Sequence, residues 1–211
     1  ASSVGSVSVT GSGTASLTLE GTASNIDAFL NTASHITYTP LANTNGNDGT
    51  TLTLTANDLG ATGSGGGLDV VLGTVNVDIT AVNDVPAFTK GADQTVDEDS
   101  GPHTVTGWAT AISKGPQDEN AQALTFAVTN ISNPLLFATA PAIDAATGNL
   151  TYTLNANASG QSTMDVGLSD DGGTANGGVD TSESQSFMIT VNAVNDAPTV
   201  VSVPSDVTVI E

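Results

Sequence analysis

Oxygen-bearing side chains gather in a few short segments of the sequence. The segment Ala81–Pro86 reads Ala-Val-Asn-Asp-Val-Pro, and it returns almost unchanged at Ala193–Pro198. Paired acidic residues stand at positions 118–119 and 170–171, and the chain has no cysteine. Carboxylate and carbonyl oxygens are the ligands that Ca²⁺ takes in proteins, usually about 6–8 of them. These residue types therefore indicate calcium binding and exclude any chemistry that needs a thiolate.

The charge of the chain excludes several classes of partner. Its 211 residues include 22 Asp and Glu but only two Lys and no Arg, which gives a formal net charge of −20. Nucleic acids and anionic membrane surfaces are bound through basic side chains, so neither is an expected partner. No apolar run approaches the roughly 20 residues of a membrane helix, and no signal-peptide layout opens the sequence. We expect a soluble piece of a longer protein, without membrane insertion.

A long internal repeat organises the sequence. The two Asn-Asp-x-Pro motifs are 112 residues apart, which is much longer than the roughly 20–50 residues of a solenoid repeat. The strand pattern at 75–79 matches 187–191 at the same spacing, and the Gly-rich loop at 58–66 matches 170–178. Farther upstream the spacing becomes 114, as between Gly46 and Gly160. The repeat predicts a first module at 1–84 that lacks its first strands, a complete module at 85–196, and the first strand of a third module at 197–211.

The local pattern predicts an all-β chain. Short alternating runs rich in Val, Thr, Ile and Leu are separated by Gly, Asn, Asp and Pro, as is typical of β-sandwiches. One short helix is indicated at 24–30, with Ser24 as its cap. The expected strands are 6–10, 14–20, 35–39, 50–57, 72–80, 92–97, 103–112, 122–129, 149–154, 163–169 and 185–193.

Three motifs together resemble one family. The Val-Asn-Asp-x-Pro linker, the strand end Thr-Val-Asp-Glu-Asp at 95–99 and the loop Asp-Gly-Gly-Thr-Ala-Asn-Gly-Gly at 171–178 are similar to the bacterial cadherin-like tandem repeats of large secreted adhesins. The resemblance implies Ig-like, cadherin-like Greek-key β-sandwich modules arranged end to end. It also implies an extracellular, secreted or cell-surface protein of a bacterium that acts in adhesion. The chain departs from the family at Ala81 and Ala193, where an acidic residue is expected, and at 110–112, where Asp-x-Asp is expected.

Strand direction predicts which ligands meet. The last strand of the second module, 185–193, runs into the linker at 195–196. The loop before this strand, which contains Asp170 and Asp171, must therefore lie at the opposite pole of the module. The linker at 83–84 enters the module at that same pole. The turn after 103–112 reaches that same pole if 92–97 runs away from the linker. Carboxylates so close together repel one another, and a calcium ion would relieve this repulsion. The expected ligands of this first junction are Asn83, Asp84, Asp118, Glu119, Asp170 and Asp171.

A second and weaker site is expected at the other pole. Glu98 stands at the far end of the first strand of the second module, where it would meet Asn195 and Asp196 of the next linker. Fewer carboxylates are available here, so calcium should bind less tightly. The other interpretation of both poles is that Asx residues and Gly172-Gly173 serve only turn geometry.

The sequence gives less support to two other functional classes, a glycosidase and a binding module. A glycosidase would need a carboxylate pair, such as Asp170 with Asp171 or Asp144 with Glu98, together with a sugar-gripping groove, and aromatic residues make up only 4% of the chain. A carbohydrate- or partner-binding module would use loops at one end of the sandwich. We expect a non-enzymatic structural or adhesive segment of a surface fibre, stiffened by calcium. His35 and His103 should have structural roles, and Trp108, Phe126, Phe137 and Phe187 should lie in the core. The apolar side of the strand with Val75, Val77 and Ile79 should also be buried.

The last residues of the sequence predict a partner. Residues 206–211 read Asp-Val-Thr-Val-Ile-Glu and match Asp-Gln-Thr-Val-Asp-Glu at 93–98. The partners we expect are neighbouring modules of the same protein. One interpretation of residues 199–211 is that the chain is cropped from a longer one. The alternative is that this segment associates with a second copy of the chain. In that case a strand of one copy would add to the open sheet of the next, and the head-to-tail contact would build a filament.

Overall fold

The computed structural model describes residues 2–4, 7–60 and 67–198 of the chain. Strands make up 42% of the protein and helices 9%, so the all-β prediction is confirmed. The chain divides into two units, with unit 1 ending at Ile79 and unit 2 beginning at Thr80. Each unit has its own sheets and its own core.

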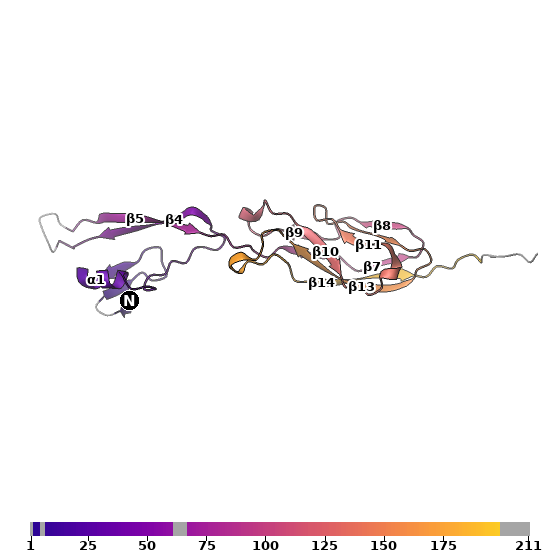
Figure 1. Cartoon of the computed structure of the whole chain (residues 1–211), viewed down its shortest axis with the longest axis horizontal. Helices are drawn as coiled ribbons and strands as arrows, with labels where there is room; N and C mark the ends of the chain where they lie inside the picture. Colours follow the sequence, from indigo (N-terminus) through magenta and orange to yellow (C-terminus); the bar gives the residue numbers. More distant parts are fainter. Residues whose placement is uncertain (1, 5–6, 61–66, 199–211) are drawn as a thin grey trace, which may run out of the picture. The chain divides into compact units, whose positions relative to one another are not determined.

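Unit 2 is built from two facing β-sheets and a short two-stranded pair, β6–β9 (Figure 1). One sheet has the order β10-β13-β14-β7, in which β7 runs parallel to β14 and the other neighbours are antiparallel. The facing sheet has the order β11-β12-β8. The strands of the unit are β6 (Ala87–Thr89), β7 (Gln94–Asp97), β8 (Pro102–Val105), β9 (Thr110–Ser113), β10 (Thr125–Thr129), β11 (Phe137–Ile143), β12 (Leu150–Leu154), β13 (Gly160–Ser169) and β14 (Gln185–Asn192).

The two sheets enclose a single hydrophobic core. Strand alternation places every second residue of β13 and β14 inward, and these inward side chains are almost fully buried. Residues of β11 and β12 complete the same core from the facing sheet. The most deeply buried side chains include Leu136, Leu150, Tyr152, Ser162, Met164, Val166, Leu168, Phe187 and Ile189.

The predicted strand at 103–112 is two strands in the structure. Gly107 has φ of +59°, which turns the chain so that β8 joins the facing sheet and β9 pairs with β6. Trp108 lies at this break and is only 4% exposed, and its indole N–H donates to the Ala92 carbonyl at 2.8 Å. The predicted burial of Trp108 is therefore confirmed.

The other differences between the predicted and the observed elements lie in irregular segments. β11 was not predicted, and its pairing with β12 shifts register at two places, which breaks the alternation that would have indicated a strand. The predicted strand at 35–39 is turn and irregular structure. Three short 3₁₀ helices, η1 (Gln117–Glu119), η2 (Pro134–Leu136) and η3 (Ala175–Gly177), lie in connections of unit 2.

Unit 1 has a small core of its own. Its first sheet has the order β1-β2-β3, with β1 at Ser2–Val4, β2 at Val7–Thr10 and β3 at Thr18–Glu20. The predicted helix is confirmed as α1 (Ala23–Leu30), although Thr22 rather than Ser24 caps it by accepting a hydrogen bond from the Asn25 N–H. The core consists of Val7, Val9 and Phe29, with Leu19 and Ile26 packed against them.

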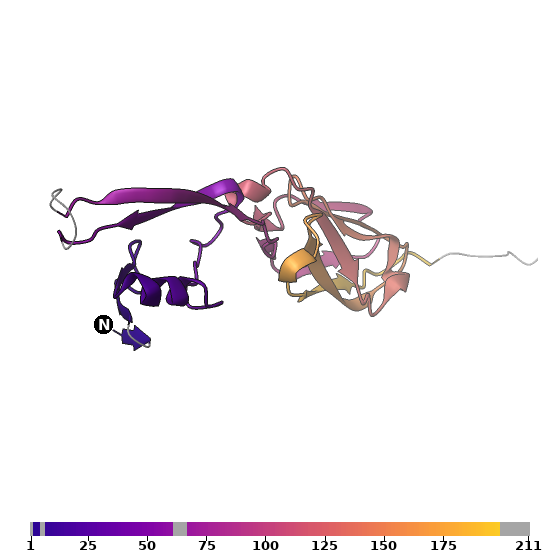
Figure 2. The ribbon, with the colours of Figure 1, turned by 60° about the vertical axis from the view of Figure 1, so that its left-hand side comes forward.

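The second sheet of unit 1 is a long antiparallel hairpin of β4 (Gly46–Ala56) and β5 (Val70–Ile79), the two-stranded purple ribbon of Figure 2. Thr50 pairs with Val77, and Leu52 pairs with Val75. The predicted burial of the apolar side of β5 is wrong at Val75, which is 63% exposed, because no further strand or sheet covers this face among the described residues.

Candidate functional site

The Asn-Asp linker is held against one end of unit 2 by the side chain of Asn83. The Asn83 amide N–H donates to Asp170 Oδ1 at 3.0 Å and to the Val179 carbonyl at 2.8 Å. Its amide oxygen accepts from Gln122 Nε2 at 2.6 Å, and its backbone carbonyl accepts from the Val179 N–H. A single Asn therefore connects the linker to two loops that are distant in sequence.

Asp84 is held through its backbone. Its N–H donates to Oε1 of Glu119 at 2.7 Å. The 3₁₀ turn η1 brings Glu119 to this position, since the Glu119 N–H donates to the Pro116 carbonyl and its own carbonyl accepts from Gln122. Glu119 is only 6% exposed, which is unusual for a glutamate. The turn therefore positions both Glu119 and Gln122 toward the linker.

Two glycines make room for these contacts. A Cβ at Gly172 would lie 1.7 Å from Oδ1 of Asn83, and a Cβ at Gly115 would lie 1.8 Å from Oε2 of Glu119. Gly115 also has φ of +125°, a backbone conformation that favours glycine. The glycines of both loops are thus required by close approach of the linker and the Glu119 carboxylate.

Three oxygens of this linker site have no hydrogen-bond partner although they are buried. They are Oε2 of Glu119, Oε1 of Gln122 and Oδ2 of Asp170. Each is an acceptor, and two belong to carboxylates. A buried polar atom without a partner costs about 1–3 kcal/mol, and more when it is charged. A cation bound to these three oxygens would therefore satisfy acceptors that have no partner within the protein.

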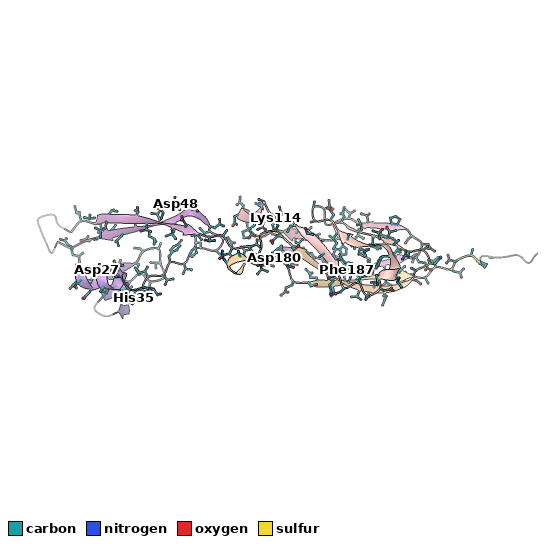
Figure 3. The ribbon with its side chains drawn as sticks, in the orientation of Figure 1. Asp27, His35, Asp48, Lys114, Asp180 and Phe187 are labelled. Atoms are coloured by element: carbon teal, nitrogen blue, oxygen red, sulfur yellow. The ribbon has the colours of Figure 1, made fainter. Side chains whose placement is uncertain are left out.

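Neighbouring groups set the electrostatics of this end of unit 2. Lys114 and Asp180 lie here as well (Figure 3), with the Lys114 ammonium donating to the Asn120 carbonyl at 2.9 Å. The Asp180 carbonyl accepts from the Asp170 N–H. Asp170 Oδ1 also accepts from the Gly172 N–H at 2.9 Å, in a tight Asx turn.

The other predicted ligands of this junction have different environments. Asp171 is exposed, and its Oδ1 accepts from the Ala123 N–H at 2.8 Å. Asp118 is exposed within η1. Over residues 2–4, 7–60 and 67–198, no three His, Cys, Asp or Glu side chains form a cluster with metal-holding geometry. The linker site is therefore a mixed set of carboxylates and amides instead of the five-carboxylate cluster that strand direction suggested.

At the opposite pole, Glu98 also holds a linker backbone. It is 8% exposed, and its Oε1 accepts from the Val194 N–H at 2.8 Å. Asn195 and Asp196 are exposed, and the Asn195 amide donates to the Asp196 carbonyl. Glu98 therefore meets the residue before Asn195, and the predicted weaker calcium set is not drawn together around it.

The carboxylates considered for catalysis have structural contacts. Asp144 forms an Asx turn in which the Thr147 hydroxyl and N–H donate to its Oδ1, and these hydrogen bonds lower the pKa of Asp144 below its ordinary value. Glu98 binds the linker backbone, and Asp170 binds Asn83. The histidines also have structural neighbours: His103 stacks on Tyr152 with ring centroids 4.9 Å apart, and His35 packs on Phe29.

Sequence reasoning missed Gln122. An amide carries no charge, so it did not stand out among acidic residues, although it lies three positions after Glu119 and shares its turn. The signal that would have found it is the segment Gln-Asp-Glu-Asn-Ala-Gln at 117–122, which follows a Gly-Pro and in which every residue except Ala121 has a side-chain oxygen.

Comparisons with protein-family models and with curated proteins give no family assignment for the chain. No protein-family model matches the chain, and a search of curated proteins finds none that is similar to it. None of the described helices has the length and apolar character needed to cross a membrane.

Proposed function

We propose that the chain is a non-enzymatic segment of an extracellular bacterial surface or fibre protein, in which cadherin-like modules are joined by short linkers that calcium fixes in place. In this proposal the linker site of unit 2 binds one Ca²⁺ ion. The ion holds the Asn83-Asp84 backbone against the module that follows it, and a repeated module of this kind acts as a stalk or adhesive repeat.

The single observation that carries the proposal is the set of unpartnered buried oxygens beside the linker. Glu119 Oε2, Gln122 Oε1 and Asp170 Oδ2 are acceptors, so another acceptor cannot satisfy them. Ca²⁺ binds such oxygens, including amide oxygens, in flexible geometry, and its charge offsets the repulsion between two buried carboxylates. No third acidic side chain clusters with these two carboxylates among the described residues, so water molecules would complete the shell from the solvent side.

The hydrogen bonds of the two carboxylates support the proposal that a bound ion would hold the linker in place. Each buried carboxylate already uses one oxygen on a linker residue: Glu119 binds the Asp84 N–H and Asp170 binds the Asn83 amide. A cation on the remaining oxygens would fix the orientation of both carboxylates, and therefore of the linker backbone that they hold. This is the positioning that second-sphere contacts give to metal ligands.

The alternative of a carbohydrate-binding module has less support. Sugar-binding surfaces use exposed aromatic rings, and in the described part of unit 2 five of the six Phe, Tyr and Trp side chains are buried, while Phe126 is partly buried. Binding of the full chain to a glycan array, retained in chelator, would favour this alternative.

The experiment compares calcium binding of the full chain with that of two matched variants. Isothermal titration with CaCl₂ should show binding to chelator-stripped protein, and calcium at a hundredfold excess over Kd should stabilise unit 2 by about 2.7 kcal/mol. Asp170→Asn should weaken binding because it removes the charge of a ligand. Asp165→Asn changes a carboxylate of β13, the strand that ends just before Asp170, but one that is bound to Ser186 and Asn130, so this variant should bind calcium like the unmodified chain.

The proposal would be contradicted if the calorimetric titration with CaCl₂ shows no heat of binding and the melting curve is identical in calcium and in chelator. Equal loss of binding in Asp165→Asn and Asp170→Asn would also contradict it, because the calcium would then be held by the general negative charge of the chain.

A further inference from the structure

The side chain of Asn83 uses both ends of its amide group within unit 2. Its Nδ2 donates to Asp170 Oδ1 at 3.0 Å and to the Val179 carbonyl at 2.8 Å, and its Oδ1 accepts from Gln122 Nε2 at 2.6 Å. An ionised carboxylate and a backbone carbonyl accept hydrogen bonds but cannot donate them. The Asn83 amide therefore fits in one orientation, with its nitrogen toward Asp170 and its oxygen toward Gln122.

This orientation of Asn83 also determines that of Gln122. Because Asn83 presents an acceptor, Gln122 turns its Nε2 toward the linker, and its Oε1 is then the atom that stays buried without a partner. A reversed Gln122 amide would present N–H donors in place of Oε1, and Ca²⁺ takes oxygen ligands. Gln122 therefore offers a ligand only while Asn83 occupies its place.

Asp170 and Glu119 are oriented by the linker in the same way. Oδ1 of Asp170 accepts from Asn83 and from the Gly172 N–H, so Oδ2 is the oxygen without a partner. Oε1 of Glu119 accepts from the Asp84 N–H, which leaves Oε2. All three unpartnered oxygens thus belong to side chains whose other polar atom is bound by the linker.

The space around Asn83 also restricts its position. A Cβ at Gly172 would lie 1.7 Å from Asn83 Oδ1 and 2.3 Å from Gln122 Nε2. A Cβ at Gly178, in the same loop, would lie 3.0 Å from Asn83 Cβ. The loop therefore holds this asparagine by its shape as well as by hydrogen bonds.

We infer that Asn83 is a positioning residue of the calcium site, which orients Gln122 and Asp170 so that their unpartnered oxygens are available to the ion. The inference rests on the proposed calcium function and adds its regulation, because the site is complete only while the linker lies in its place. Such coupling is reciprocal, since linker docking and calcium binding strengthen each other by the same factor. The role differs from the sequence prediction, in which Asn83 is itself a ligand.

The second linker supplies a matched control. Asn195 stands in the same Asn-Asp-x-Pro motif, but it is exposed, and its amide donates to the carbonyl of the neighbouring Asp196 at 3.2 Å. This linker is described as far as Pro198, and residues 199–211, the segment considered for association with a second copy, lie outside the described residues. A substitution at Asn195 changes the same motif away from the Glu119, Gln122 and Asp170 side chains.

The first test measures the calcium affinity of the full chain by isothermal titration calorimetry. Asn83→Asp and Asn195→Asp each add one negative charge to a chain of net charge −20, so general electrostatic attraction would tighten binding in both. Asn83→Asp should instead raise Kd by about 10–100-fold, as the loss of a second-sphere partner does. The reason is that a carboxylate oxygen would then face the Asp170 carboxylate with no proton to donate. Asn195→Asp should bind calcium like the unmodified chain.

A second pair of variants displaces Asn83 without changing any oxygen. Gly172→Ala places a methyl group where Asn83 Oδ1 lies, whereas a Cβ at Gly167 of β13 would meet nothing within 4 Å. Neither glycine has the left-handed backbone conformation that disfavours alanine. Gly172→Ala should raise the Kd for calcium by about tenfold or more, and Gly167→Ala should leave it unchanged. This pair also decides the question if Asn83→Asp does not fold.

Terbium luminescence separates positioning from a general loss of structure. Tb³⁺ binds to oxygen ligands as Ca²⁺ does, and its luminescence decay in H₂O and in D₂O gives the number of water molecules bound to it. At saturating Tb³⁺, Asn83→Asp should hold about one or two more waters than the unmodified chain, because Gln122 or Asp170 no longer supplies a ligand. Asn195→Asp should hold the same number as the unmodified chain.

Unchanged or tighter calcium binding in Asn83→Asp would overturn the inference. Equal Kd values for Gly172→Ala and Gly167→Ala would do so too, as would an equal number of terbium-bound waters in all three chains. In each of these cases the unmodified chain still binds calcium, so the proposed function would stand. Absence of calcium binding by the unmodified chain would instead contradict the proposed function, and the inference with it.

Discussion

Glu119 is the residue on which the linker site depends most directly. Its carboxylate is buried, one oxygen holds the Asp84 N–H, and the other has no partner. Without a cation, the unpartnered charged oxygen destabilises the folded state; with a cation, the same oxygen becomes a ligand. A single substitution should therefore have opposite effects on stability in the two conditions.

We predict that Glu119→Gln stabilises unit 2 in chelator and removes most of the stabilisation by calcium. The gain in chelator should be about 1–3 kcal/mol, because glutamine keeps an acceptor for Asp84 and replaces the unpartnered charge with a neutral amide. Chemical denaturation with and without calcium measures both effects. The exposed Glu183→Gln is the control, and a variant that is less stable in chelator would contradict the account.

Asp165 gives the chain a pH dependence that is independent of calcium. The Ser186 hydroxyl and then the Asn130 amide donate to its carboxylate, and these hydrogen bonds lower the pKa of Asp165 below its ordinary value of 3.8. A lowered pKa in the folded state contributes stability above the ordinary pKa, and this contribution is lost as pH falls through the lowered value. The free energy of unfolding, measured in chelator, should therefore decrease less steeply below pH 3.8 in Asp165→Asn than in the unmodified chain.

At the scale of elements, Trp108 joins the two sheets of unit 2 at the break between β8 and β9. Its ring packs on Phe187 with centroids 4.6 Å apart, and its N–H donates to the Ala92 carbonyl. Trp108→Ala should destabilise unit 2 by about 3–5 kcal/mol, because a large cavity would open between the sheets. Urea unfolding followed by circular dichroism measures this loss, and Trp108→Phe, which keeps a ring, should lose less.

The sequence predicted the regular elements well and the irregular ones poorly. β13 and β14 alternate without interruption, because one face of each is fully buried, so their positions followed from the pattern alone. β11 has two register shifts, and the run at 103–112 turns at Gly107, so neither obeys a single period. The exposure of Val75 was not predictable from β5 itself, since burial depends on a covering strand elsewhere.

The candidate site was predicted in part for a similar reason. Strand direction placed Asn83, Glu119 and Asp170 at one pole, and the structure joins Asn83 to Asp170 and Glu119 to the linker. The contribution of Gln122 and the use of backbone N–H groups by the carboxylates depend on the local 3₁₀ turn. A turn of this kind has no period in sequence from which it could be predicted.

At the scale of the whole molecule, the two units have cores of very different size. Among the described residues, the buried core of unit 1 consists of Val7, Val9 and Phe29, whereas that of unit 2 contains fifteen residues. Hydrophobic stabilisation scales with buried apolar area, so unit 1 should unfold at a lower temperature. The chain has one tryptophan, and it lies in unit 2. On heating, circular dichroism should show a first unfolding transition, that of unit 1, during which the fluorescence of Trp108 does not change. Unfolding transitions that coincide in the two signals would contradict this prediction.

The parallel pairing of β7 with β14 also determines how unit 2 bears a pulling force. β7 lies near the start of the unit and β14 near its end, so tension on the chain slides these two strands lengthwise past each other. Their hydrogen bonds are then loaded together, whereas in the β4–β5 hairpin the chain enters at Gly46 and leaves at its paired residue Ile79, so tension opens the pairs one after another. Single-molecule stretching should therefore show a high rupture force for unit 2 and a low one for the hairpin.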